Sequence, residues 1–373
     1  MMLTLSFIGF LIISLIGYWA LRSQKYRVAF LIITGLSYIF HLDIKSGIFV
    51  IALTVLTWFL GNRLKKKRTT ALLSVSVVLV VTSLLYFKYS NFFFILLDLK
   101  QFIINEKIFL PLGISYITFK HISYLADIYW EKIEPGSFLN FLLYSAFFPI
   151  FLAGPIERFE RFEPQLKETL KFKLSDFGEG YKRIAYGIFK KFVIADGIGI
   201  LLTREIISSA TPGIPKEITN LILFSFQIYF DFAAYSDIAI GSSRFFGIKI
   251  MENFNYPYLS PNIAIFWNNW HISLSEWLRD YIFYPLSFAL RRRKFLNYFT
   301  PVVTMFVCGL WHGASTGFII WGLWHGLGLF VYQFWSRSAM AKKINQFPLQ
   351  GVFNTVGVLI TFTFITIGWL WFR

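Results

Sequence analysis

Long apolar runs recur along the whole chain and constrain its fold more than any other feature. An α-helix crosses the hydrocarbon core of a membrane with roughly 17 to 25 mostly apolar residues. Runs near or somewhat below that length include Leu3–Leu21, Ala71–Phe87 and Val352–Phe372. With 56% hydrophobic and only 15% charged residues, the chain has too little polar surface to cover a soluble globule of its size. The pattern predicts an all-α polytopic integral membrane protein with about ten to thirteen membrane-embedded helices, several too short to cross unaided.

The net charge of +16 is concentrated at the ends of the apolar runs. Basic clusters at 22–27 and 63–68 bracket the second and third predicted helices, and further basic residues follow at 182–183, 190–191 and 291–294. Positive charge beside helix ends marks cytoplasmic loops. The charge therefore predicts membrane lipid rather than nucleic acid as a partner, and it places the N-terminus outside. The first run lacks a basic leader and a small-residue cleavage site, so we expect a retained helix.

We predict a single membrane-embedded domain, 1–373. The distribution of polar and aromatic residues divides it into two parts. Residues 1–110 read as plain hydrophobic helices with few internal polar groups, as expected of lipid-facing packing. Residues 111–373 interleave aromatic with polar residues, interrupted by Pro and Gly, and hold the candidate functional side chains. The single cysteine, Cys308, excludes a disulfide framework.

The segment 261–285 has the clearest amphipathic pattern. One continuous helix would place its tryptophans on one face and its amide, hydroxyl and charged residues on the opposite face. Asn268, His271 and Ser275 would share one ridge of the polar face, because they are three and four residues apart. Two interpretations stay open: an interfacial anchor with its tryptophans in lipid, or a helix whose polar face lines a water-filled cavity.

The triplet Trp-His-Gly occurs twice, at 311–313 and 324–326. On one straight helix the two histidines would be roughly 20 Å apart along the axis and about 140° apart around it. A turn at the intervening GASTG would bring the two histidines closer, but no third ligand stands at metal-site spacing, so we expect no metal site. We expect His325 to be a hydrogen-bonded structural residue.

His312 is the candidate general base. A polar group at membrane depth is a functional hypothesis by default, and apolar neighbours favour the neutral imidazole that can accept a proton. Gly309 and Gly313 would leave room for a substrate beside it. We expect His41 and His121, by contrast, to lie at the membrane interface.

Two aspartates in an apolar run, Asp231 and Asp237, need partners at membrane depth. Asp231 is one turn from Tyr235, and Asp237 is two turns before Arg244. We expect structural ion pairs here rather than a catalytic function, because pairing is how membrane interiors accommodate ionised groups.

Five motifs resemble those of the membrane-bound O-acyltransferases, in particular the branch that contains the membrane subunit of bacterial alginate O-acetyltransferase. In chain order they are FFPIFLAGPIERFERFEPQL, YFDFAAYSDIAIG, ENFNYPY, FWNNWHISLSEWLRDYIFYPL and CGLWHGASTGFIIWGLWHG. The similarity runs from about Pro111 to Arg373 and is specific because all five occur in order. This chain has Asn268 and Asn269 where such relatives usually have basic residues. It also stops where they often continue through further helices, so we expect a short or C-terminally incomplete member.

The resemblance implies a fold with a funnel or tunnel at its centre, in the plasma membrane of a bacterium. It implies transfer of an acetyl group from a cytoplasmic thioester, acetyl-CoA or an acyl carrier protein, to a hydroxyl of an extracellular polysaccharide or cell-wall polymer. No bound cofactor is expected, and the expected partner is an extracytoplasmic acetyltransferase or other polysaccharide machinery. His312 would be the base and His271 the second signature histidine. The residues that we expect to bind substrates are Trp267, Asn268, Asn269, Ser275, Arg279 and Trp311.

Two functions of other classes compete with acyl transfer. Many helices with polar residues at depth also suit a transporter or flippase, although the chain has no paired halves of the kind that build many transporters. A haem or metal protein could use His271, His312 and His325. No Gly-x-Ser-x-Gly nucleophile is present, which favours direct transfer over an acyl-enzyme intermediate.

Overall fold

The computed structural model describes residues 5–96, 98, 110–168, 171–203, 216–341 and 350–373. Within these ranges every element is a helix, apart from one isolated antiparallel bridge between Phe254 and Trp270. The prediction of an all-α protein is confirmed. The first two residues of the predicted run Leu3–Leu21 lie outside the described residues. So do residues 99–109, next to the boundary expected near residue 110.

The chain divides into two compact units, and their boundaries differ from the one expected near residue 110. Unit 1 consists of Met1–Gly187 with Tyr235–Met251, and unit 2 of Ile188–Ala234 with Glu252–Arg373. The assignment of the chain to a single domain stays a prediction.

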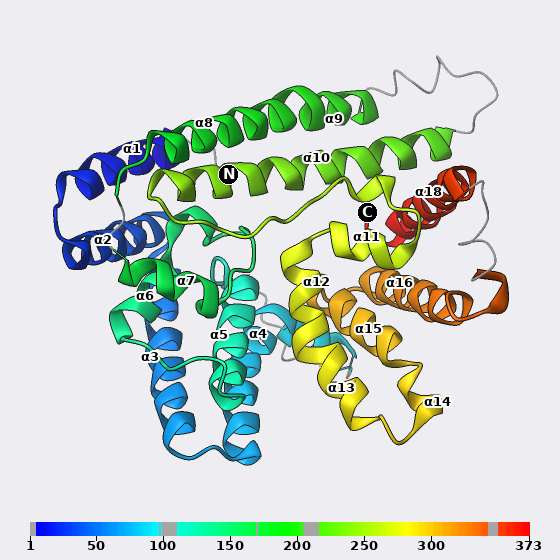
Figure 1. Cartoon of the computed structure of the whole chain (residues 1–373), viewed down its shortest axis with the longest axis horizontal. Coiled ribbons are helices and arrows are strands. Elements are labelled where there is room, and N and C mark those ends of the chain that lie inside the picture. Colours follow the sequence, from blue (N-terminus) through cyan, green and yellow to red (C-terminus); the bar gives the residue numbers. More distant parts are fainter. Residues whose placement is uncertain (1–4, 97, 99–109, 169–170, 204–215, 342–349) are drawn as a thin grey trace. The chain divides into compact units, whose positions relative to one another are not determined.

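Unit 1 contains long apolar helices followed by shorter ones. They are α1 (Leu5–Ala20), α2 (Gln24–Leu42), α3 (Ile44–Lys66), α4 (Thr70–Leu96), α5 (Ile114–Tyr129), α6 (Phe138–Ala146), η2 (Phe148–Ile150), α7 (Phe159–Lys167), α8 (Leu174–Ile188, whose last residue belongs to unit 2) and the end of α10 (Lys216–Phe245). Helices α3, α4 and α5 pack side by side (Figure 1).

Helix starts in unit 1 follow from capping residues. The Asp43 side chain accepts a hydrogen bond from the backbone N–H of Ser46 at 2.5 Å and so begins α3. Ser137 accepts from the backbone N–H of Asn140 at 3.1 Å and begins α6. Each cap satisfies an N–H that has no partner inside its own helix, which is why Ser and Asp are favoured there.

The core of unit 1 contains a buried histidine that was expected at the membrane interface. His121 on α5 is fully buried, so that prediction is wrong. Its Nδ1 lies 3.0 Å from the Thr57 hydroxyl on α3, and its Nε2 lies 3.0 Å from the Ser145 hydroxyl on α6. Because both ring nitrogens have partners, burial costs little here. His41, in the last turn of α2, is exposed.

Unit 2 consists of many short helical pieces and three long helices. They are η3 (Phe189–Ala195), α9 (Asp196–Thr203), the first part of α10, η4 (Pro257–Leu259), α11 (Ile263–Asn269), α12 (Ile272–Leu278), η5 (Arg279–Phe283), α13 (Tyr284–Ala289), α14 (Lys294–Asn297), α15 (Thr300–His312), α16 (Thr316–Trp335), α18 (Gln350–Gly368) and η6 (Trp369–Trp371). Helices α15 and α16 form an antiparallel hairpin (Figure 1).

Four helical segments in the described part of the chain are long and apolar enough to cross a membrane. They are Ile44–Lys66, Thr70–Ser90, Thr316–Trp335 and Gln350–Trp371, and Ser6–Ala20 and Thr300–His312 are shorter apolar helices. The protein is therefore a multi-pass membrane protein, as predicted. The predicted total of about ten to thirteen membrane-embedded helices would require six to nine more, and that number stays a prediction.

The hairpin of α15 and α16 depends on glycines that let two backbones touch. A Cβ on Gly309 would lie 2.2 Å from the carbonyl oxygen of Phe318, and a Cβ on Gly322 would lie 2.4 Å from that of Met305. Such close contact of small residues is a usual way for helices to associate in membranes. The room at Gly309 is thus filled by α16, and the expectation that it admits a substrate is wrong.

Candidate functional site

The segment 261–285 is broken into pieces rather than forming the single helix that its periodicity predicts. Helix α11 ends at Asn269, and α12 begins at Ile272. Between them His271 has φ 43°, in the left-handed region that residues other than glycine rarely adopt. Downstream, η5 is a π-helix over Arg279–Phe283. The shared ridge of Asn268, His271 and Ser275 is therefore not formed.

A preceding extended segment stabilises the break. The backbone N–H of Asn255 donates to the carbonyl of Asn269 at 3.0 Å, and the N–H of Ile272 donates to the carbonyl of Asn253 at 2.9 Å. These bonds pair the backbone groups that α11 and α12 leave open at the break. They also offset the cost of the left-handed residue, which is why a helix is not continued here.

The tryptophans of this segment are buried. Trp267, Trp270 and Trp277 are 6%, 5% and 4% exposed. The interpretation as an interfacial anchor with its tryptophans in lipid is therefore wrong. Their rings pack inside unit 2 instead, where Trp270 lies 5.3 Å from the ring centroid of Trp369.

A cavity of about 560 Å³ lies among α11, α12, η5, α15 and α16 within unit 2. Four of the predicted substrate-binding residues line it: Trp267, Asn268, Ser275 and Arg279. The other two, Asn269 and Trp311, do not. Its remaining lining residues are Ala264, Ile272, Glu276, Leu278, Phe283, Pro301, Thr304, Met305, Leu329, Tyr332, Gln333 and Ser336. This mixture of apolar walls with a few polar groups is typical of small-molecule sites.

His271 has a defined tautomer. Its Nδ1 lies 3.1 Å from Oδ1 of Asn253, and the same oxygen accepts from the backbone N–H and the hydroxyl of Ser273, at 3.3 and 2.8 Å. An amide oxygen only accepts, so Nδ1 of His271 must carry the proton. The neutral ring then presents a bare lone pair at Nε2. That atom is buried and has no hydrogen-bond partner in the part of the chain that the structure describes.

His312 is the last residue of α15 and is half-buried among aromatic rings. The ring centroids of Trp311, Trp321 and Phe372 lie 4.7, 5.0 and 4.8 Å from its own. The space beside Gly313 is taken as well, because a Cβ there would lie 2.4 Å from the ring of Phe318. The expected room for a substrate next to both glycines is thus occupied by protein atoms.

The two Trp-His-Gly triplets lie on opposite arms of the hairpin rather than on one straight helix. The chain turns at residues 313–315, and the Ser315 hydroxyl accepts the N–H of Phe318 at 3.5 Å to begin α16. As a result one ring, Trp321, contacts both His312 at 5.0 Å and His325 at 4.7 Å between centroids.

His325 is fully buried, but it lacks the hydrogen bond expected of it. Neither ring nitrogen has a hydrogen-bond partner in the described parts of the chain. Its ring packs against Trp321 and, at 5.2 Å between centroids, against Trp267. Trp267 therefore stands between the cavity that it lines and the two histidines of the hairpin. The ring of Trp311 lies between the other two histidines, with its centroid 6.3 Å from that of His271 and 4.7 Å from that of His312.

The sequence did not single out several residues that build this site. Asn253 holds His271, and the rings of Trp321, Trp369 and Phe372 surround the hairpin histidines. Asn253 lies in the motif ENFNYPY, where a polar residue among aromatic ones is the signal that could have drawn attention to it. No group of three His, Cys, Asp or Glu side chains placed to hold a metal occurs among the described residues.

Ion pairs account for both aspartates, with partners that differ from the expected ones. Asp237 pairs with Arg183 at 2.7 Å rather than with Arg244. Asp231 pairs with Lys191 at 2.7 Å, and Lys191 also reaches Asp196 at 2.9 Å. The expectation of structural pairing is confirmed, and the choice of partner within α10 is wrong.

Fold and site together define a multi-pass α-helical membrane protein with three histidines and several tryptophans packed beside a cavity. Residues 5–367 match the family model of the membrane-bound O-acyltransferases. Probable alginate O-acetylase AlgI of Pseudomonas syringae is 34% identical over 96% of this chain and 69% of its own length. The peptidoglycan O-acetyltransferase of Helicobacter pylori is 30% identical over 98% of this chain and 75% of its own.

A third relative, the teichoic acid D-alanyltransferase of Bacillus subtilis, is 32% identical over 69% of this chain and 67% of its own length. The chain belongs to the membrane-bound O-acyltransferase family, and it is an O-acyltransferase. The resemblance carried by its five motifs is confirmed.

Proposed function

We propose that this protein moves an acetyl group from a cytoplasmic thioester, acetyl-CoA or an acyl carrier protein, to a hydroxyl acceptor for O-acetylation of an extracellular polysaccharide or the cell wall. The names of two relatives, an alginate O-acetylase and a peptidoglycan O-acetyltransferase, support both the acetyl group and the acceptor class. The observation that carries the proposal is the continuous packing from the 560 Å³ cavity through Trp267 and Trp321 to His312.

In the proposed reaction the imidazole of His312 takes the proton of the acceptor hydroxyl. The hydroxyl oxygen then bonds to the acyl carbon while the carbon–sulfur bond breaks, and the proton passes to the departing thiolate. One positioned base contributes typically about 10²–10⁴-fold to the rate. Holding both substrates in reacting geometry must supply much of the remainder.

His271 would assist through its unprotonated Nε2. A bare lone pair accepts hydrogen bonds and cannot donate one to a thioester carbonyl, so the tautomer held by Asn253 favours tuning of the base over polarising the carbonyl. The donor end of the site would be the cavity. The exposed guanidinium of Arg279 at its edge and the exposed cluster Arg291–Arg293 would attract an anionic thioester by long-range charge.

The proposed setting is the bacterial inner membrane with the N-terminus outside, since the basic loops after α1 and α3 suit the cytoplasm. The acceptor would be delivered by a separate extracytoplasmic acetyltransferase or by polysaccharide machinery. Relatives named for action on three different polymers support a shared donor step with differing acceptors.

The test is thiol release by the purified full chain in nanodiscs, given acetyl-CoA or an acetylated carrier protein and a polysaccharide acceptor. His312→Ala should lower the rate by about 10²–10⁴-fold at matched protein level. His41→Ala removes an exposed histidine at the end of α2 and should leave the rate unchanged. Full activity of His312→Ala would remove the proposed base. Flux of a solute into proteoliposomes that contain the purified chain, without thiol release, would instead favour the transporter alternative.

A further inference from the structure

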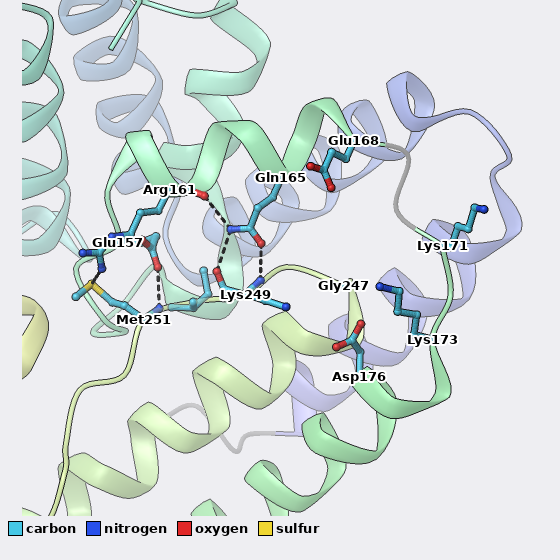
Figure 2. A pocket seen from close by; sticks show the side chains of 11 residues that line it. Glu157, Arg161, Gln165, Glu168, Lys171, Lys173, Asp176, Gly247, Lys249 and Met251 are labelled. Atoms are coloured by element: carbon cyan, nitrogen blue, oxygen red, sulfur yellow. Dashed lines mark hydrogen bonds between the residues drawn. The ribbon is translucent and has the colours of Figure 1, made fainter. Parts of the chain in front are cut away.

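A second cavity, of about 580 Å³, lies within unit 1 and takes no part in the proposed acyl transfer. It is bounded by α7, by the first turn of α8 and by the extended segment that follows α10 (Figure 2). Its lining residues are Glu157, Arg161, Gln165, Glu168, Lys171, Lys173, Asp176, Gly247, Lys249, Ile250 and Met251. We call it the basic pocket, because four of these residues carry a positive charge.

Side chains fix one wall of the basic pocket. The Gln165 amide donates to the carbonyl of Lys249 at 3.0 Å, and its oxygen accepts the N–H of Lys249 at 2.8 Å (Figure 2). The Glu157 carboxylate accepts the N–H of Met251 at 2.8 Å. These hydrogen bonds fix the backbone of residues 249–251 beside Gln165 and Glu157, so the position of the Lys249 backbone in the pocket wall is defined.

Two of the three carboxylates in the pocket are already engaged. Glu157 is buried and accepts the backbone N–H of Arg158 at 3.0 Å as well as that of Met251. Burial raises the pKa of the Glu157 carboxyl, which weakens its negative charge further. Asp176 lies 3.5 Å from the guanidinium of Arg244. Only Glu168, at the exposed rim, stays as a carboxylate without a described partner.

The lysines of the pocket are not neutralised in the same way. Lys171, Lys173 and Lys249 are exposed, and in the part of the chain that the structure describes no carboxylate lies within ion-pair distance of their ammonium groups. Arg161 adds a fourth positive charge to the same walls, and that charge interacts with the Glu157 carboxylate. The three lysines therefore give the pocket positive charge that its own acids do not balance.

We propose that the basic pocket binds the phosphate of an anionic ligand, either a phospholipid headgroup or a water-soluble diphosphate. Ammonium groups bind phosphate as compact point charges, and several can contact one group from different sides. Exposed single pairs are worth little, so a phosphate that several ammonium groups contact at once is favoured over an anion that only one of them contacts. A cavity of about 580 Å³ has room for a headgroup or a diphosphate.

The experiment uses the full chain purified in neutral detergent. Inorganic pyrophosphate is titrated by calorimetry at low salt, and phosphatidylglycerol retained from mixed micelles is counted by native mass spectrometry. The test variant is Lys173→Gln/Lys249→Gln. The matched control is Lys66→Gln/Lys67→Gln, which removes the same charge from exposed lysines at the end of α3. Thermal unfolding shows whether each variant keeps its fold.

Wild type and the control should bind one of the two probes saturably, and the test variant should bind it about tenfold more weakly. Saturable pyrophosphate binding identifies a soluble diphosphate as the ligand, whereas retention of one phosphatidylglycerol identifies a lipid headgroup. The proposal is overturned if neither probe binds saturably to the wild type, or if the folded test variant binds as tightly as the control. Acyl transfer is not measured, so this result is independent of the proposed function.

Discussion

Asn253 should be the residue on which the geometry around His271 most depends. Its amide oxygen receives three hydrogen bonds, from the His271 ring and from the backbone N–H and hydroxyl of Ser273. In Asn253→Ala the hydroxyl can rotate to another acceptor, but the ring and backbone donors stay buried without partners. Each unsatisfied buried donor costs about 1–3 kcal/mol. The substitution should therefore lower the free energy of unfolding by about 2–6 kcal/mol.

The matched control is Asn255→Ala, two residues along the same segment. Asn255 is exposed and contributes only its backbone N–H to the pairing with Asn269, so its side chain should matter by less than about 0.5 kcal/mol. Asn253→Asp keeps an acceptor oxygen for every donor and should recover most of the stability. The assay is denaturant unfolding of the purified protein in detergent, followed by tryptophan fluorescence. Equal stability of Asn253→Ala and Asn255→Ala would refute this account of the break between α11 and α12.

Three further substitutions test the packing of the site and the ion pairs. Gly309→Ala places a Cβ 2.2 Å from a carbonyl of α16 and should cost about 1–3 kcal/mol in thermal unfolding. Gly9→Ala meets nothing within 4 Å and should be neutral or stabilising, so equal effects would contradict the close-contact argument. Trp267→Ala opens the cavity toward the hairpin histidines and should raise acceptor-independent hydrolysis of acetyl-CoA, whereas Trp267→Phe should not. Unchanged hydrolysis in both variants would show that the Trp267 ring does not separate the cavity from these histidines. Arg183→Ala removes the arginine that pairs with the buried carboxylate of Asp237, and it should lower the free energy of unfolding by about 1–3 kcal/mol. A loss below about 0.5 kcal/mol would mean that water replaces the ion pair.

The features that could be predicted from the sequence are those that depend on neighbours along the chain. Apolar runs indicate helices directly, because burial in lipid is a property of short windows of sequence. The all-α class and the multi-pass arrangement followed from these. Four of the six expected substrate-binding residues also meet at one cavity, because α11, α12 and η5 are close in sequence.

The errors arose where a distant segment decides the local structure. Periodicity favoured one helix over 261–285, but residues 253–255 offer backbone partners that stop it at His271. Burial of His121 depends on hydroxyls from α3 and α6, which no window around it contains. Asp237 takes Arg183 from another helix in preference to Arg244 on its own. In each case a tertiary hydrogen bond or ion pair overrides a pattern that is correct only for an isolated helix.

The repeated Trp-His-Gly triplet shows how one sequence pattern can serve two structural purposes. In the first copy His312 ends α15, and Gly313 is extended backbone at the start of the turn, where the nearest atoms to a Cβ belong to the movable ring of Phe318. In the second copy the helix continues, and Gly326 is a packing position, because a Cβ there would lie 2.7 Å from the Cα of Val302. A methyl group at residue 313 would therefore displace a side chain, whereas one at 326 would push two backbones apart. Because the chain turns back at residues 313–315, the histidine that ends α15 and the histidine inside α16 contact the same indole ring, that of Trp321.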